Sequence, residues 1–132
     1  WWSVDSSNIE FIKDVISKFG YPSEKLVGKE TNSMISIILL HYDKDTSNHI
    51  MGKDLNLALK NGGITPKMYA WIIDRHLMAA GKDQLYYSIP FPWGNMSNEQ
   101  KLRYNQNRYS IGLKSLDELK IIVRGNSVYV KS

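Results

Sequence analysis

The sequence contains no cysteine, only four prolines among its 132 residues, and no long apolar run. The absence of cysteine excludes disulfides, thiolate metal sites and cysteine nucleophiles. The longest apolar stretch, residues 35–40 with Ser36 inside it, is far too short to cross a bilayer. A phosphate loop and a G-x-G-x-x-G pattern are also absent. We therefore expect no membrane span and no cofactor.

The sequence contains no cluster of charges of one sign. The 17 Lys and Arg residues and 13 Asp and Glu residues are spread along the chain, for a formal net charge of +4. This pattern lacks the basic stripe of a nucleic-acid-binding protein, so no nucleic-acid partner is expected. The chain starts at Trp1 without a signal-peptide pattern. We expect a trimmed or processed N-terminus, which leaves the compartment unknown.

The residues that are present predict one soluble globular domain over 1–132, with 42% hydrophobic and 23% charged residues. Helical periodicity and capping patterns mark five segments. The first helix starts at the capping-box pair Ser7 and Glu10 and stops before Gly20, and Thr65-Pro66 opens the fourth. The expected helices are residues 7–19, 31–41, 47–61, 66–80 and 98–109.

The last residues predict a different structure. Two β-branched runs flank Gly125-Asn126 within residues 119–131, which is the pattern of a β-hairpin. The short connections between the helices favour antiparallel neighbours. The predicted fold is therefore mainly α: a small array of four to five antiparallel helices with a C-terminal two-stranded hairpin. An isolated hairpin is marginal in water, so we expect it to pack on the helices or to pair with another chain.

His41 and Asp43 are the first unusual polar residues, because His41 extends the apolar stripe of the helix over 31–41. His-x-Asp could bind a metal, with His49 and Asp74 as further ligands, but the spacing fits no known metal motif. It could instead pair an imidazole with an orienting carboxylate. The alternative is a hydrogen-bonded core histidine, with Asp43 or Asp45 capping the next helix.

Asp74 and Arg75 are adjacent in the fourth predicted helix and diverge by about 100°, so they cannot easily pair. Trp71 and Met78 flank Asp74 at helical spacing and tilt it inward. A buried carboxylate needs a partner, either His41 or the donors of another loop. Arg75 would point into a cleft, where its guanidinium suits a carboxylate or phosphate. Alternatively, both residues belong to one structural ion-pair network.

Gln84 and Tyr86 alternate with their neighbours, so in an extended chain they project to the same side. Such a segment lines a cleft or packs on a helix. The aromatic residues Trp71, Phe91 and Trp93 would form the walls of a cleft or a lid over the core.

The chain also resembles a bacterial domain family of unknown function. The resemblance rests on "GYPSEKLVGKE", "LLHYDKD", "IIDRHLMAAGKDQLYY" and "NRYSIGLKSLDE" in this order and covers about residues 8–119. The family pattern runs Gly-Tyr/Trp-Pro, Gln-His-x-Asp, Asp-Arg, Gly-x-x-Gln-x-Tyr-Gly-Thr-Gln and Arg-x-x-x-Gly-Leu. The positions that match are Gly20, Pro22, Gly28, His41, Asp43, Asp74, Arg75, Gly81, Gln84, Tyr86 and Gly112.

The departures from the family pattern are specific. Leu40 stands where the family has Gln, His49 falls near another Gln, and Tyr87-Ser88-Ile89 replaces Gly-Thr-Gln. If the Gly-Thr-Gln segment contributes chemistry, this chain has lost or changed it. The resemblance implies a fold and the location of a site, and it supplies no reaction.

These observations support two functional hypotheses. In the first, His41, Asp74, Arg75, Gln84 and Tyr86 line a polar cleft that binds a small-molecule or peptide ligand, and Arg75 holds an anionic group. In the second, the protein is an enzyme. His41 is then its general acid or base, Asp43 or Asp74 orients His41, and Arg75 stabilises negative charge. A third possibility is that the polar set is entirely structural.

Overall fold

The structure is a computed structural model of the chain. It describes the backbone of residues 2–40, 49–89, 96–118, 120–124 and 127–131, and the side chains of residues 10–40, 52–89 and 96–118. No helix within these ranges is long and apolar enough to span a membrane.

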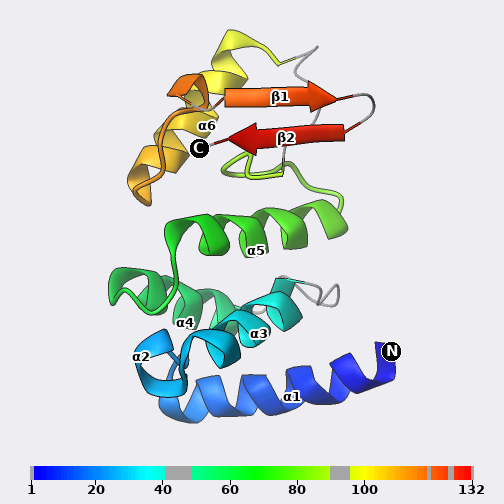
Figure 1. The fold of residues 1–132 in the computed structure, drawn as a ribbon, viewed down its shortest axis with the longest axis vertical. Coiled ribbons are helices and arrows are strands. Elements are labelled where there is room, and N and C mark those ends of the chain that lie inside the picture. The colour runs from blue at the N-terminus through cyan, green and yellow to red at the C-terminus, as the bar shows by residue number, and fades with distance from the viewer. Residues whose placement is uncertain (1, 41–48, 90–95, 119, 125–126, 132) are drawn as a thin grey trace.

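Helices make up most of the described chain, so the mainly α prediction is confirmed. Figure 1 shows α1 at one end of the long axis, α3 and α4 next to it, α5 beyond them, and α6 with two strands at the other end. The described part holds six α-helices, not four or five, because a short α2 was not expected. The helices are α1 (Trp2–Phe19), α2 (Glu24–Val27), α3 (Lys29–Leu40), α4 (His49–Lys60), α5 (Pro66–Ala79) and α6 (Asn98–Ser110).

The core lies where α3 and α4 contact both α1 and α5. Apolar residues at helical spacing supply it, such as Ile12 and Ile16 on α1, and Leu39 on α3 is completely buried. The main cluster consists of Ile12, Ile16, Tyr21, Leu39, Leu40, Leu55, Ala58, Ile64, Tyr69, Ala70, Ile72 and Tyr86. Because Tyr86 belongs to this cluster, the core continues beyond α5 into the segment that follows it.

α1 and α3 differ in part from the expectations. α1 begins at Trp2, so the predicted start at Ser7 is wrong, and the capping-box pair lies inside the helix. Its end is as predicted: Gly20 has φ +80°, and its N–H donates to the Ile16 carbonyl at 2.8 Å. α3 begins at Lys29, two residues before the predicted start, and its apolar residues Met34 and Ile37 are 61% and 50% exposed. Only the faces of α3 toward α1, α2 and α5 are covered.

α5 begins as the sequence predicts. Thr65 is its N-cap, the Thr65 Oγ1 accepts the Met68 N–H at 3.2 Å, and Pro66 occupies the first turn. The helix ends before Gly81, which has φ +72°. α5 is therefore fixed at both ends, and it carries Asp74, Arg75 and His76 in its last turns.

α6 begins with a capping box that the sequence reading missed: the Ser97 Oγ accepts from Gln100 N, and the Gln100 side chain accepts from Ser97 N. A single 3₁₀ turn, η2 (Leu116–Glu118), contacts α6. Strands β1 (Lys120–Arg124) and β2 (Ser127–Lys131) follow and pair antiparallel, with Ile122 opposite Tyr129.

Candidate functional site

Asp74 lies inside the molecule, with no exposed surface, on the side of α5 that carries the fully buried Ala70. Its Oδ1 accepts the backbone N–H groups of Leu85 at 2.7 Å and Tyr86 at 3.1 Å. Its Oδ2 accepts the backbone N–H of Ser88 at 2.8 Å and the Ser88 hydroxyl at 2.6 Å. A carboxylate offers about four acceptor positions, and here all four are filled. Asp74 therefore fixes the segment that follows α5.

The Gln84 side chain is hydrogen-bonded to the end of the same segment. Its Nε2 donates to the Ile89 carbonyl at 2.8 Å, and its Oε1 accepts the Ile89 N–H at 2.9 Å. Gln84 is 6% exposed. Because Gln84 is buried and its amide binds both backbone groups of Ile89, the side chain is directed at the loop and not at solvent. The side chain that was expected to line a cleft instead holds residues 84–89 in a closed loop.

Tyr87, at the centre of this loop, has φ +50°, the only positive φ of a non-glycine residue in the described chain. A side chain in this left-handed region costs about 1–2 kcal/mol. The Tyr87 ring contacts the Tyr104 ring on α6, with centroids 5.2 Å apart. The hydrogen bonds of Asp74 to the residues on both sides of Tyr87 help to maintain this conformation.

Arg108 on α6 holds the other side of the loop. It is 5% exposed, its Nη1 donates to the Tyr86 carbonyl at 2.9 Å, and its Nε donates to the Lys114 carbonyl at 2.6 Å. Burial lowers the pKa of the Arg108 guanidinium, and the negative charge of Asp74 acts in the opposite direction. Since an arginine keeps its proton in proteins, Arg108 remains the cation that faces the buried carboxylate.

The sequence reading did not name Arg108 as a site residue, although a signal was present. Arg108 is the arginine of the Arg-x-x-x-Gly-Leu pattern, four residues before Gly112. We call the side chains of Asp74, Gln84, Ser88 and Arg108 the loop anchor. Asp74 and Gln84 are hydrogen-bonded to the backbone of residues 84–89. The Ser88 hydroxyl donates to Asp74, and Arg108 donates to the Tyr86 and Lys114 carbonyls.

Tyr86 also belongs to the interior. Its side chain is 8% exposed and meets Tyr69 edge to face, with ring centroids 6.1 Å apart and an interplanar angle of 63°. Burial raises the pKa of the Tyr86 hydroxyl well above its usual value, and Tyr69 and Asp74 raise it further. Tyr86 therefore packs the core and stays protonated at neutral pH.

Arg75 differs from its neighbour Asp74 because it is exposed. It lines an open hollow of about 440 Å³ together with Met78, Ala79 and Ile89. Within the described part of the chain, Arg75 makes no hydrogen bond or ion pair. The sequence predicted that Arg75 points into a cleft, and the structure places it at this hollow beside Ile89, at the end of the loop.

The other expected site residues do not join this arrangement. His41, Asp43, Phe91 and Trp93 lie outside the described residues, as does the side chain of His49. The expected contact between His41 and Asp74 or Asp43 therefore stays a prediction. Trp71 is 41% exposed, so it does not tilt Asp74 inward as the sequence reading assumed. Trp71 and Asp74 are three residues apart on α5, but Trp71 is exposed and Asp74 is completely buried.

His76 is a buried histidine that the site hypotheses left out. It is 8% exposed, and its Nε2 lies 2.6 Å from the Leu39 carbonyl, which ties α5 to the end of α3. This is the hydrogen-bonded core histidine that was one alternative for His41. Among the described side chains, no group of three or more His, Cys, Asp or Glu residues could hold a metal ion.

Comparison of the chain with models of protein families, with curated proteins and with solved structures finds no match. The site must therefore be interpreted from its own geometry. Three of the expected ligand-binding residues, Asp74, Gln84 and Tyr86, are buried, and the first two hold the loop. Arg75 is the expected residue that is exposed to solvent and free to contact a ligand.

Proposed function

We propose that this domain binds a small anionic ligand and that Arg75 contacts its anionic group. The proposal keeps the binding hypothesis and moves the site from the Asp74 side of α5 to the Arg75 side. The guanidinium would bind a carboxylate or phosphate through paired hydrogen bonds.

The observation that carries the proposal is the outer row of α5. Lys67, Trp71, Arg75 and Ala79 follow one another at intervals of four, so they lie on one face, and all four are exposed. The only acidic residue of α5 is Asp74, which is buried. All exposed charge on α5 is therefore positive, and this favours an anion at its surface.

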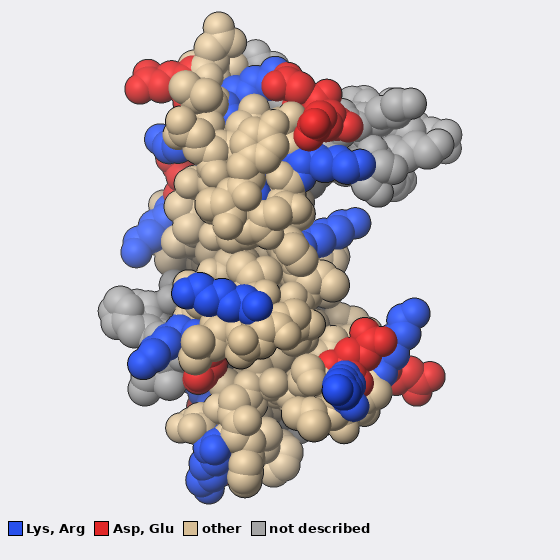
Figure 2. All heavy atoms as spheres, turned by 90° about the vertical axis from the view of Figure 1, so that its left-hand side faces the viewer, with Lys and Arg blue, Asp and Glu red and all other residues tan. Residues whose placement is uncertain are grey.

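This row is a local feature. On the face of the molecule shown in Figure 2, Lys and Arg are spread along the whole length, and Asp and Glu lie among them toward both ends. A general basic surface, of the kind that binds a polyanion without a defined site, is not seen on that face. The row on α5 combines two cations with an aromatic and an apolar hollow, which suits a ligand of limited size.

The hollow beside Arg75 adds an apolar contact surface. Met78, Ala79 and Ile89 line it, and Gln84 holds both backbone groups of Ile89. A wall that is fixed before binding loses little conformational entropy when a ligand arrives. The loop anchor would therefore support binding, because it holds the wall of the Arg75 hollow in place.

The enzyme hypothesis loses one of its components. It assigned Asp74 as a possible orienting carboxylate for His41, but the two Asp74 oxygens already accept four hydrogen bonds. The Ser88 hydroxyl does donate to the Asp74 carboxylate, but this carboxylate is completely buried and holds the loop, so it is poorly placed to act as a base on a substrate. We therefore favour binding over catalysis.

We also propose that the resemblance to the bacterial domain family reflects a shared loop. Where the family has Gly, this chain has Tyr87 with φ +50°, a conformation that favours glycine. Where the family has Thr, Ser88 donates its hydroxyl to Asp74. A threonine could make the same bond. The family pattern therefore fits the geometry of the loop anchor at these two positions.

We also propose that neighbouring helices run antiparallel and that the hairpin packs on them. This packing is supported by the pairing of β1 with β2 and by the weakness of an isolated hairpin in water.

The test is a titration of the ¹⁵N-labelled protein with sodium hexanoate and with inorganic phosphate, followed by amide chemical shifts. We expect saturable shifts near Ala79 and Ile89. Arg75→Ala should weaken binding at least about tenfold, since a charge-assisted hydrogen bond contributes about that factor. Arg103→Ala removes an exposed arginine from α6 and should leave binding unchanged. Equal binding by Arg75→Ala and wild type would refute the proposal.

A further inference from the structure

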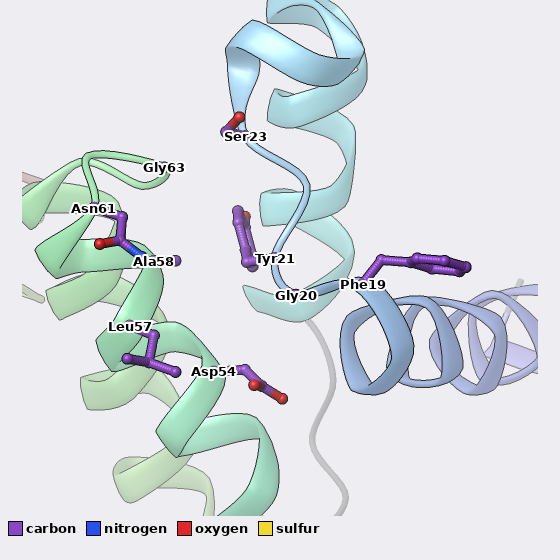
Figure 3. Close-up of a pocket in the computed structure, with 9 residues that line it drawn as sticks. All are labelled: Phe19, Gly20, Tyr21, Ser23, Asp54, Leu57, Ala58, Asn61 and Gly63. Atoms are coloured by element: carbon purple, nitrogen blue, oxygen red, sulfur yellow. The ribbon is translucent and has the colours of Figure 1, made fainter.

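A second hollow lies at the opposite side of the core, between the end of α1 and α4, and has a volume of about 290 Å³. We call it the α1–α4 pocket (Figure 3). The α1 end and the chain after it contribute one side, and α4 with the turn that follows contributes the other. The lining residues are Phe19, Gly20, Tyr21, Ser23, Asp54, Leu57, Ala58, Asn61 and Gly63.

The pocket has a fixed aromatic wall. The Tyr21 ring is 9% exposed, and its hydroxyl lies 2.8 Å from the Ser36 Oγ. Because the Ser36 hydroxyl donates to the Asn32 carbonyl at 3.0 Å, the Tyr21 hydroxyl is the donor in its bond to Ser36. The tyrosine hydroxyl is thereby used inside the protein, so a ligand would meet the tyrosine ring.

Apolar side chains complete the surface. Leu57 is 47% exposed and Phe19 is 82% exposed, although both are large apolar residues. Figure 3 shows Asp54 at the end of the pocket near Gly20 and Phe19, with Ser23 and Gly63 at the other end. A ligand in this space would therefore place an apolar part against Leu57 and Tyr21 and a polar part near Asp54.

The polar side chains of the α1–α4 pocket have no partners within the described part of the chain. Neither the Asp54 carboxylate nor the Asn61 amide makes a hydrogen bond or an ion pair there. Ser23 caps α2 by position, but its hydroxyl makes no capping bond. Three polar side chains without a partner among the described residues therefore line one hollow. In a structural network such groups would be bonded to the protein, whereas here they are available to a ligand.

The charge of the pocket selects the ligand. Asp54 is the only charged residue among the nine that line it, so its net charge is negative. We propose that the α1–α4 pocket binds a primary ammonium group on a short apolar stem, with Asp54 as its counter-ion. The ammonium group would donate to the Asp54 carboxylate, and its apolar stem would lie against Leu57 and the Tyr21 ring.

The same chemistry can come from two sources, a free amine or the lysine side chain of a peptide. This site is independent of the Arg75 hollow, because the two share no residue and select opposite charges. A failure of one proposal leaves the other unaffected.

The experiment is an amide chemical-shift titration of the ¹⁵N-labelled protein with benzylamine, with neutral benzyl alcohol as the control ligand. We expect saturable shifts at Gly20, Asn61 and Gly63, and binding of benzylamine at least about tenfold tighter than that of benzyl alcohol. A second pair, N-acetyl-lysine amide and N-acetyl-norleucine amide, identifies the source. Tighter binding of the lysine derivative than of benzylamine indicates a peptide, and weaker binding indicates a free amine.

Three variants test the assignment. Asp54→Asn should abolish the preference for benzylamine, while Asp83→Asn, the same change at an exposed position outside the pocket, should keep it. Gly63→Ala leaves the charges intact and adds a methyl group 3.5 Å from the Ser23 Cβ, between two walls of the pocket. It should weaken both benzyl ligands. If Asp54→Asn failed to fold, Gly63→Ala would still decide whether this pocket is the binding site.

Three outcomes would overturn the proposal. The first is the absence of saturable shifts in the pocket. The second is equal affinity for benzylamine and benzyl alcohol. The third is unchanged binding of benzylamine by Asp54→Asn or by Gly63→Ala.

Discussion

Asp74 and Asp54 are two aspartates on neighbouring helices with opposite surroundings. Asp74 on α5 is completely buried and accepts four hydrogen bonds from the loop that follows its helix. Asp54 on α4 is half-buried, lines the α1–α4 pocket and accepts none from the described residues. The residue type is the same, so the surroundings alone distinguish a structural carboxylate from one that is free to bind a ligand.

The tyrosines of the two regions show no such difference. Tyr86 packs against Tyr69 above the loop anchor, and Tyr21 donates to Ser36 behind the α1–α4 pocket. Both side chains are more than nine-tenths buried. Each region thus has a rigid aromatic support, and the difference between them lies in the hydrogen bonds of the carboxylate.

The largest expected effect comes from removing the two carboxylates in turn. Asp74→Ala should lower the free energy of unfolding by about 3–5 kcal/mol, because it leaves the N–H donors of the loop without an acceptor and the buried Arg108 cation without the negative charge near it. Asp54→Ala should change it by less than about 1 kcal/mol, since Asp54 accepts no hydrogen bond from the described residues. Urea unfolding of both variants beside wild type measures the two losses.

A smaller change at the same place sharpens this comparison. Ser88→Ala removes only the hydroxyl that donates to Asp74 at 2.6 Å and should cost about 1 kcal/mol. Similar losses for Asp74→Ala and Asp54→Ala would show that the loop anchor contributes no more to stability than the pocket carboxylate does.

Most of the helices could be predicted from the sequence because helix ends carry local signals. Thr65-Pro66 and Gly81 bound α5, and each acts on its own helix without help from distant residues. The predicted start of α1 was wrong because it also relied on a local signal. Ser7 and Glu10 have capping-box spacing, but the residues before them are helical as well, and α1 begins at Trp2. A local pattern cannot show whether the preceding chain is helical as well.

For the site, the sequence located the right segments and misjudged their roles. It predicted that Asp74 points inward and that loop donors could be its partners, and the structure confirms both. It assigned Gln84 to a ligand, whereas Gln84 binds Ile89 five residues later. Whether a polar side chain finds a partner depends on the three-dimensional path of the loop, including the positive φ of Tyr87, and no periodicity encodes that path.

The α1–α4 pocket was not predicted at all. Its walls come from the end of α1 and from α4, more than thirty residues apart in the sequence, and Asp54 looks like any solvated acid of an amphipathic helix. A large aromatic residue just before the helix-ending Gly20 was a weak signal. The exposure of Phe19 and the absence of partners for Asp54 become visible only once the helices are packed.

An intermediate effect is expected when the two buried tyrosines ionise. Burial raises the pKa of both Tyr86 and Tyr21, while the bond to Ser36 opposes part of the shift for Tyr21. In the unfolded chain both ionise near pH 10. The stability that they contribute is therefore fully present below pH 10 and is lost as the pH rises above it. Between pH 10 and pH 11 the loss should be about 1–2 kcal/mol.

Tyrosinate absorbance and urea unfolding, each followed from pH 9 to pH 12, measure this effect. Tyr86 and Tyr21 should ionise late, together with unfolding. Tyr86→Phe should reduce the alkaline loss more than Tyr21→Phe, because the pKa of Tyr86 is raised by Tyr69 and Asp74 in addition to burial. Ionisation of all eight tyrosines of the chain near pH 10 without unfolding would contradict the buried positions of these two rings.

The smallest effect on stability is expected for Arg75→Ala, and this variant is best compared with Arg108→Ala. Arg75 is exposed and has no partner among the described residues, so its loss should change the free energy of unfolding by about 0–1 kcal/mol. Arg108 is buried and donates to two carbonyls, so the same substitution should cost about 3–5 kcal/mol. Thermal unfolding of the two variants beside wild type decides between two roles for Arg75. An unchanged midpoint with lost hexanoate binding would make Arg75 a ligand contact, and a loss as large as that of Arg108→Ala would place it in the loop anchor.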